Sequence, residues 1–289
     1  MKMHRLAYKE AGVAFAFLAP SLIGFAVFYL IPFGQNIVIS FQGRLEGEGL
    51  TLASYRELFQ SSSFQKAAAN TFWFTAISVP TLIVLSLALA MLLNQRVFLR
   101  NWLRTAYVLP LVVPAASIVM VWQILFDWNG VLNAIWNDWG MSRQDWIKSD
   151  WASLVLLLIY IWKYVGYNII LFLAGLQNIP EQYYEIADLE GAGPVRKLLQ
   201  ITLTYLTPTT VLIVLMSVLN SFKMFRETYL LTGDYPYDRI YMMQHYMNNM
   251  FLSLDIHKLS AAAVVMAVGI LALVAVLFRT ERAFSSFME

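Results

Sequence analysis

Lysine, tyrosine and asparagine side chains interrupt an otherwise apolar segment near the middle of the chain. The segment covers residues 152–176, and its centre carries Lys163, Tyr164, Tyr167 and Asn168. Aromatic faces can stack on the C–H faces of a sugar ring, while amide and hydroxyl groups can form hydrogen bonds with its hydroxyls. Tyr167 lies one helical turn from both Lys163 and Tyr164, so these side chains share a helix face. We therefore predict that this segment lines a substrate path.

A second polar patch ends the next apolar segment, residues 203–222, where Asn220 and Ser221 are further candidates for the substrate path. Tyrosine and asparagine inside a membrane need hydrogen-bond partners, which either a polar ligand or a neighbouring helix supplies. Lys163 can equally face a wet cavity or extend its flexible stem toward water. Contacts between helices therefore explain each of these residues as well as a substrate does, and both interpretations stay open.

Ion-coupled transport and hydrolysis need side chains that this sequence lacks in the expected places. All acidic residues lie outside the predicted apolar cores, so we expect no buried carboxylate relay of the kind that proton- and sodium-driven carriers use. The sequence has no Gly-x-x-x-x-Gly-Lys-Ser/Thr loop for ATP, and no His-Glu-x-x-His or Gly-x-Ser-x-Gly signature. There is no cysteine, and a net charge of +2 gives no reason to expect nucleic acid. We expect no catalytic residues and no metal site; uphill transport would take its energy from another subunit.

The composition indicates how these side chains are positioned. Of the 289 residues, 59% are apolar or aromatic and only 13% are charged, whereas soluble domains are about a quarter charged. Because a helix needs about 20 apolar residues to cross the bilayer, the charge-free stretches predict an all-α, polytopic membrane protein that forms a single membrane domain over residues 1–289. The six predicted spans are residues 12–32, 70–94, 103–126, 152–176, 203–222 and 259–278.

Basic residues set the expected orientation. They are denser in the short segments 1–11, 95–102, 177–202 and 279–289 than in the other loops, so the positive-inside rule places these segments and both termini in the cytoplasm. The first apolar run, from Ala11 to Pro32, is longer than the core of a secretory signal, so we interpret it as an uncleaved span.

The longest cytoplasmic loop has the pattern of two short amphipathic helices with a break between them. Pro180 and Glu181 suit a helix start, because proline needs no N–H there and the acid meets the positive end of the helix dipole. Gly191 and Gly193 would end the first helix, and Pro194 would begin the second. Such a loop suits docking on another protein, although by periodicity alone an ordinary connector is the stronger interpretation.

The residues of this loop resemble the EAA motif of importer-type ABC permeases, whose pattern is Glu-Ala-Ala, three residues and then Gly, followed by Ile-x-Leu-Pro. The central matches are Glu185, Ala187 and Gly191. Ile186 stands in the second position of that pattern, where the first alanine is expected. The matches further on are Ile201 and Leu203, followed by Thr204 where proline is common, and then Pro208. The resemblance implies that the loop at residues 181–199 is the coupling loop, and that Glu185, Ala187 and Gly191 face an ATPase.

Further similarities extend over nearly the whole chain and resemble the first permease of a maltose or multiple-sugar pair. They are Ala19-Pro20-Ser21-Leu22-Ile23-Gly24, Trp162-Lys163-x-x-Gly166, Ala174-Gly175-Leu176-Gln177-x-Ile179-Pro180 and Tyr229-Leu230-Leu231-Thr232-Gly233. In that family Tyr167 matches a tyrosine that lines the sugar site. Where many relatives have Gly-Gly-Pro, this chain has Gly233-Asp234-Tyr235-Pro236, which leaves the subfamily open.

The resemblance implies the importer-type ABC permease fold, a place in the bacterial cell membrane, and import of sugars or oligosaccharides by alternating access. The implied partners are a second permease, two ATPase subunits that bind the ATP, an extracytoplasmic solute-binding protein and the sugar itself. The chain would then bind no cofactor of its own.

Two other classes of function remain as alternatives. A stand-alone secondary carrier of a neutral solute is the first, and a buried ion relay would distinguish it. A membrane enzyme is the second, and it would need a cluster of His, Asp or Glu at one membrane face.

Overall fold

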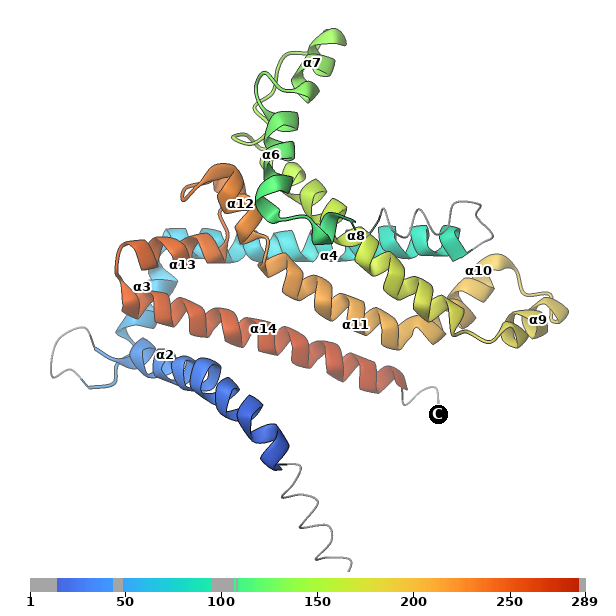
Figure 1. Ribbon diagram of the computed structural model, residues 1–289, viewed down its shortest axis with the longest axis horizontal. Coiled ribbons are helices and arrows are strands. Elements are labelled where there is room, and N and C mark those ends of the chain that lie inside the picture. Colours follow the sequence, from blue (N-terminus) through green and yellow to red (C-terminus); the bar gives the residue numbers. More distant parts are fainter. Residues whose placement is uncertain (1–14, 44–48, 95–106, 108, 286–289) are drawn as a thin grey trace, which may run out of the picture. The chain divides into compact units, whose positions relative to one another are not determined.

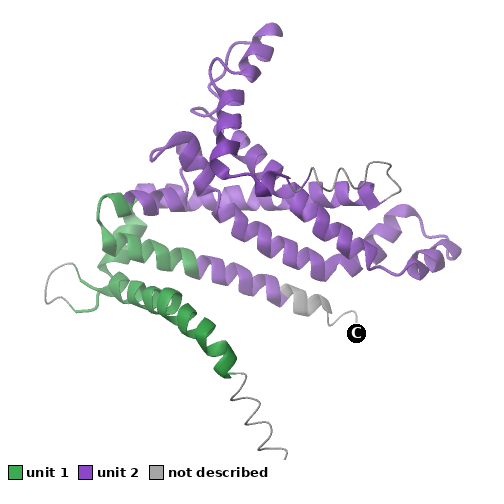
Figure 2. Cartoon of the chain, in the orientation of Figure 1, with its two compact units in different colours: residues 1–61, 250–267 green, residues 62–249, 268–289 purple. Residues whose placement is uncertain are grey.

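The computed structural model describes residues 15–43, 49–94, 107 and 109–285, and within these residues the chain is helical with no β-strand. Backbone contacts divide the chain into two compact units, coloured separately in Figure 2. Unit 1 comprises residues 1–61 and 250–267, and unit 2 comprises residues 62–249 and 268–289.

Unit 1 holds the first span and a short helical return. Residues 15–25 are α-helical and continue through the π-helix η1 (Ala26–Leu30) into α2 (Ile31–Phe41); α3 (Ala53–Gln60) follows. The hydroxyls of Ser40 on α2 and Tyr55 on α3 are 2.8 Å apart, and Lys258 pairs with Glu57 of α3 at 3.2 Å. In the most apolar window of the first span no residue is buried within the chain.

Unit 2 is built around three long helices that pack against one another: α4 (Ser62–Asn94), α8 (Ala152–Gln177) and α11 (Leu203–Phe222) (Figure 1). Small residues allow the close packing, as in other membrane bundles. A Cβ atom at Gly175 of α8 would stand 2.7 Å from the Leu206 side chain of α11, and one at Gly166 would collide with the backbone of Tyr107.

Shorter helices complete the chain. They are α6 (Ala115–Phe126), α7 (Val131–Asp138), α9 (Glu181–Leu189), α10 (Pro194–Lys197), the π-helix η2 (Leu198–Thr202), α12 (Phe225–Thr232), the 3-10 helix η3 (Asp238–Ile240), α13 (Met243–Leu252) and α14 (Ile256–Ser285). The last of these begins in unit 1 and continues into unit 2.

Among the described residues, six helical stretches are long and apolar enough to cross a membrane, which confirms the predicted number of spans. They are Phe15–Phe41, Ser62–Asn94, Ala115–Asp138, Ala152–Gln177, Pro194–Thr232 and Ile256–Arg279. The fifth is much longer than predicted, because α10 and η2 lead into α11 and α12 follows it.

Part of the sequence prediction falls outside the described residues. This applies to the predicted start of the first span at residue 12, to residues 103–106 of the third span, and to the basic segments 1–11 and 95–102 that set the orientation.

One side chain organises the loop between α6 and α8. Asn133 of α7 is buried, and its Nδ2 atom donates to three backbone carbonyls, those of Asp127, Trp128 and Gln144, at 2.8–3.2 Å. Its Oδ1 atom accepts from the Gln144 N–H at 3.0 Å and from the Trp146 indole at 3.1 Å. The two ends of the loop are therefore joined through a single amide group.

Candidate functional site

Two of the predicted path residues lie in the contacts between α4, α8 and α11. Asn168 is buried and donates to the hydroxyl of Ser217 on α11 at 3.0 Å. Ser221 is also buried, and its hydroxyl is 2.9 Å from that of Thr75 on α4. The Tyr160 hydroxyl donates to the backbone carbonyl of Ser217 at 2.7 Å. These bonds favour the interpretation of Asn168 and Ser221 as links between helices.

The other predicted path residues have different degrees of exposure. Tyr167 and Asn220 are half-buried, whereas Tyr164 is buried and its ring centroid lies 5.2 Å from that of Tyr160. The ammonium of Lys163 lies 5.0 Å from the centroid of the Tyr164 ring. Tyr167 is therefore the aromatic member of the predicted set that stays accessible, and its role in the path stays a prediction.

Lys163 has a partner that the sequence analysis missed. Its ammonium bonds Oε1 of Glu227 on α12, and Glu227 is 1% exposed. The expectation that every acidic residue lies outside the apolar cores is therefore wrong. The reason is that α12 continues the fifth apolar stretch beyond residue 222, so that Glu227 packs against α8 instead of lying in a solvated loop. The neighbouring Lys223 and Arg226 make this stretch look like a loop, and the spacing of Glu227 from Lys163 gives no sign of the pairing.

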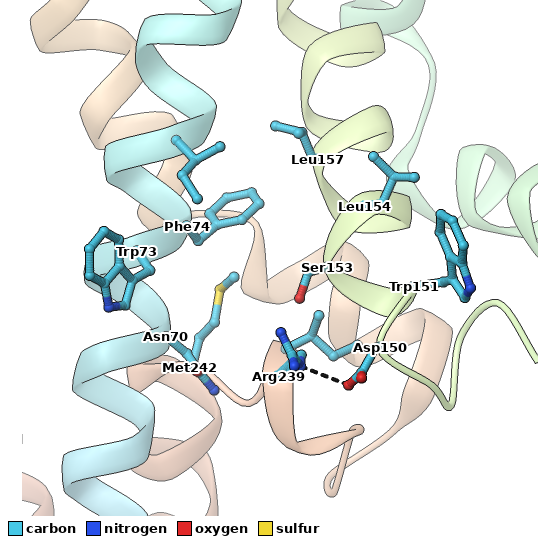
Figure 3. A pocket seen from close by; sticks show the side chains of 12 residues that line it. Asn70, Trp73, Phe74, Asp150, Trp151, Ser153, Leu154, Leu157, Arg239 and Met242 are labelled. Carbon is cyan, nitrogen blue, oxygen red and sulfur yellow. Dashed lines mark ion pairs between the residues drawn. The ribbon is translucent and has the colours of Figure 1, made fainter.

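A groove of about 650 Å³ is also absent from the sequence prediction. It lies among α4, the start of α8 and the segment around η3 (Figure 3). Its aromatic and aliphatic walls include Trp73, Phe74 and Leu157, and at one end Arg239 pairs with Asp150 at 2.7 Å. Each of these residues is unremarkable in the sequence, because only the fold brings residues 70–77, 150–157 and 239–242 together.

The segment at residues 181–199 has the predicted two-helix form. The first helix, α9, starts directly after Pro180, Gly191 adopts φ +73°, and α10 starts at Pro194. Glycine suits this left-handed conformation because it has no Cβ atom, which in other residues comes too close to the backbone there. Lys197 pairs with Asp188 at 2.5 Å, which joins the second helix to the first.

The outer surface of this loop is apolar and accessible. Ile186, Leu189 and Val195 are all more than half exposed, and Glu185 is exposed beside them. Ala187 lines a small hollow of about 170 Å³. The loop thus presents apolar side chains next to a carboxylate, a surface suited to contact with another protein.

Comparison with known proteins assigns the chain to a family. Residues 82–288 match the family described as "Binding-protein-dependent transport system inner membrane component". The chain belongs to this family. The permease fold and the membrane location predicted from the sequence are therefore confirmed.

Individual relatives agree over most of the chain. The arabinooligosaccharides transport system permease protein AraP of Bacillus subtilis is 34% identical over 78% of this chain and 74% of its own length. The sulfoquinovosyl glycerol transport system permease protein SmoG of Agrobacterium fabrum is 29% identical over 93% of this chain and 90% of its own. The trehalose/maltose transport system permease protein MalF of Thermococcus litoralis is 27% identical over 80% and 81%.

The fold is also found in a solved structure. A crystal structure of a bacterial ABC transporter involved in the import of the acidic polysaccharide alginate contains a chain that superimposes with a TM-score of 0.82 at 21% identity. The match covers 98% of this chain and 99% of the other.

Proposed function

We propose that this chain is one of two membrane-spanning permease subunits of an ATP-driven importer of sugars or oligosaccharides. The observation that carries the proposal is the family match over residues 82–288, together with relatives whose names refer to transport of arabinooligosaccharides and of trehalose and maltose. The resemblance in the EAA motif supports the same function from the residues themselves.

In this proposal the loop at residues 181–199 transmits ATP hydrolysis from two cytoplasmic ATPase subunits to the spans. The exposed apolar residues of α9 and α10 and the exposed Glu185 suit such a contact. ATP would be bound by those partners, this chain would bind no cofactor of its own, and both termini would lie in the cytoplasm.

The second permease would pack on surfaces that this chain leaves open. The first span is the clearest of these, since no residue in its most apolar window is buried within the chain. An extracytoplasmic solute-binding protein would deliver the sugar. A solved ABC transporter that includes a chain of this fold, at 22% identity and a TM-score of 0.82, is described in complex with an alginate pentasaccharide-bound periplasmic protein.

A stand-alone secondary carrier is the second candidate, and the buried Glu227 favours it because such carriers place carboxylates within the membrane. The ammonium of Lys163 already neutralises this carboxylate, however, which makes it a poor proton or sodium site. A docking loop would also have no purpose in a lone carrier.

Co-purification tests the assembly. A tagged copy should retain a second permease and two ATPase chains, and the reconstituted complex should take up oligosaccharides only with ATP and a binding protein. Uptake by the single chain in response to a proton gradient would contradict the proposal.

A further inference from the structure

The groove beside Trp73 runs from the ends of two spans into their apolar part. On α4 its lining begins at Asn70 and continues to Ile77, which lies about 10 Å further along the helix at 1.5 Å per residue. At the end near Asn70, Arg239 and Asp150 form an ion pair (Figure 3). The lining therefore changes from polar to apolar, as the surroundings of a span do between the membrane interface and the hydrocarbon.

Two tryptophans indicate that the groove opens toward lipid. Trp73 on one wall and Trp151 on the other are 62% and 41% exposed within the chain (Figure 3). Tryptophan is enriched where a span crosses the membrane interface, because its amphipathic ring suits the level of the headgroups. Ile77 and Leu154, further along the same helices, are also more than 40% exposed. An acyl chain is the natural neighbour of such a surface, whereas an aqueous path would leave it in contact with water.

The third wall of the groove is held in place by α4. The side-chain amide of Asn70 donates to the backbone carbonyls of Asp238 and Tyr241, at 2.6 and 2.9 Å. Ile240 and Met242 of this segment are buried and line the groove. Its volume of about 650 Å³ is within the range of about 300–1,000 Å³ that is usual for ligand pockets. The groove is therefore a built site of suitable size.

The ion pair at the polar end offers one group of each charge to a ligand. Nε of Arg239 lies 2.7 Å from Oδ1 of Asp150, and the Tyr237 hydroxyl donates to the same oxygen at 3.1 Å. A guanidinium has five N–H donors in a geometry that matches a phosphate, and a carboxylate accepts at two oxygens. Both side chains are more than 60% exposed, so each can contact a ligand while the pair persists.

We propose that this groove binds a phospholipid with an ethanolamine headgroup. The phosphate contacts Arg239, the ammonium contacts Asp150, and one acyl chain lies along α4 and α8. A headgroup that carried only negative charge would gain from Arg239 but would be repelled by Asp150, whereas the zwitterion matches both. The neighbouring Lys66–Asp238 pair, at 2.9 Å, adds no net charge that would favour an anionic lipid. The site does not depend on which solute the chain carries.

A phosphatidylethanolamine with a diazirine on its acyl chain tests the site directly. The full chain, purified with the subunits that it retains, is mixed with this probe, irradiated and digested. Labelled peptides should include residues 70–77 and 150–157. Unlabelled phosphatidylethanolamine should compete at about a tenfold lower concentration than phosphatidylglycerol, because only its ammonium can bond Asp150.

Paired variants separate the headgroup contact from the fold. D150N/R239Q keeps side chains of similar size and removes both charges, so both segments should still be labelled while the preference for phosphatidylethanolamine disappears. K66Q/D238N is the matched control, because it removes a neighbouring exposed pair that does not line the groove, and it should keep the preference. Exposed ion pairs contribute little to stability, so both variants should melt like the parent.

Ser153 provides a test of the acyl-chain contact. Its side chain points into the groove (Figure 3). Ser153→Phe should fill part of this space and reduce labelling of both segments, without any change in charge.

The site is overturned if the probe labels neither segment of the parent, if the two lipids compete equally, or if D150N/R239Q keeps the preference. Unchanged labelling of Ser153→Phe would also contradict it. Displacement of the probe by an oligosaccharide would overturn it as well, because the groove would then belong to the sugar path.

Discussion

At the scale of single residues, burial separates side chains that hold helices together from those that a substrate can reach. Asn168 forms a hydrogen bond with Ser217, and Ser221 forms one with Thr75. Both bonds join helices within the bundle. Tyr167 is half-buried on the same helix as Asn168. Residue type alone could not make this distinction, because a tyrosine and an asparagine in a span have the same need for partners whichever way they face.

Replacing Tyr167 with alanine should lower sugar uptake tenfold or more while the complex still assembles. Loss of a neutral hydrogen bond costs about 0.5–1.5 kcal/mol, and loss of the stacking area adds to it. Tyr167→Phe serves as the matched variant, because it keeps the ring and removes the hydroxyl. Uptake and complex yield should be measured together; parental uptake by both variants would show that Tyr167 only packs.

His245 of α13 predicts a pH effect on stability. Its ring is fully buried, lies 4.8 Å from that of Phe225, and accepts the backbone N–H of Met242 at Nδ1. Burial lowers the pKa of His245 to about 4 from its ordinary value of 6.5. The folded chain therefore resists protonation that the unfolded chain undergoes, and stability present above pH 6.5 is lost as the pH falls toward 4.

Thermal unfolding measures the size of this effect. The free energy of unfolding should be about 2 kcal/mol lower at pH 5 than at pH 7.5. Thermal unfolding in detergent at the two pH values should show it, and His245→Phe should reduce the difference. An equal difference in the variant would mean that other groups are responsible.

At the scale of elements, the loop at residues 181–199 shows how much local sequence can specify. Proline and glycine at the ends of α9 and α10 set its form, and the sequence prediction of a helix, a break and a second helix is confirmed. The prediction succeeded because proline and glycine determine the backbone conformation at their own positions, without contacts from distant segments. Glu227 was missed for the opposite reason: its environment comes from α8, 64 residues earlier.

Gly191→Val should abolish transport and the stimulation of ATP hydrolysis, while the chain still inserts into the membrane. The φ angle of Gly191 is +73°, where a β-branched residue is strained. Gly193 provides a matched control, because it has φ −68° and open space around its Cβ position. Gly193→Val should therefore transport, and equal activity of the two variants would contradict the assignment.

Gly166→Ala should destabilise the packing around α8. A Cβ atom at this position would overlap the backbone of Tyr107, so either the helix or its neighbour must move, at a cost of about 1–3 kcal/mol. Gly269→Ala on α14 meets nothing within 4 Å and should be tolerated. The melting temperature of purified Gly166→Ala should be lower than that of purified Gly269→Ala. Equal melting temperatures would show that Gly166 is not tightly packed against Tyr107.

At the scale of the whole molecule, the number of spans and the fold class were predictable because hydrocarbon imposes a minimum length on any apolar helix. Their ends were less predictable. The fifth stretch includes Lys197 and Arg226, charges that usually mark a loop, but Lys197 lies in α10 and Arg226 in α12, so both positions are helical. The groove beside Trp73 depends on three distant segments, so no local pattern could reveal it.

The purified chain alone should neither hydrolyse ATP nor drive sugar uptake. It carries no phosphate-binding loop, and its buried carboxylate is neutralised by Lys163. Vesicles that contain only this chain, with ATP or with an imposed proton gradient, test both statements. Adding back the co-purified partners should restore ATP-dependent uptake, which would exclude simple inactivation of the chain.

The five hydrogen bonds of Asn133 also have a consequence in genetic terms. A single-nucleotide change in an asparagine codon yields tyrosine, histidine, aspartate, isoleucine, threonine, serine or lysine. None of these carries an amide, so none can place two N–H hydrogens among three carbonyls and accept two further hydrogens at the same position. In a saturation screen for function, codon 133 should therefore tolerate almost no missense change, although Asn133 lies in a helix of only eight residues, outside the core formed by α4, α8 and α11.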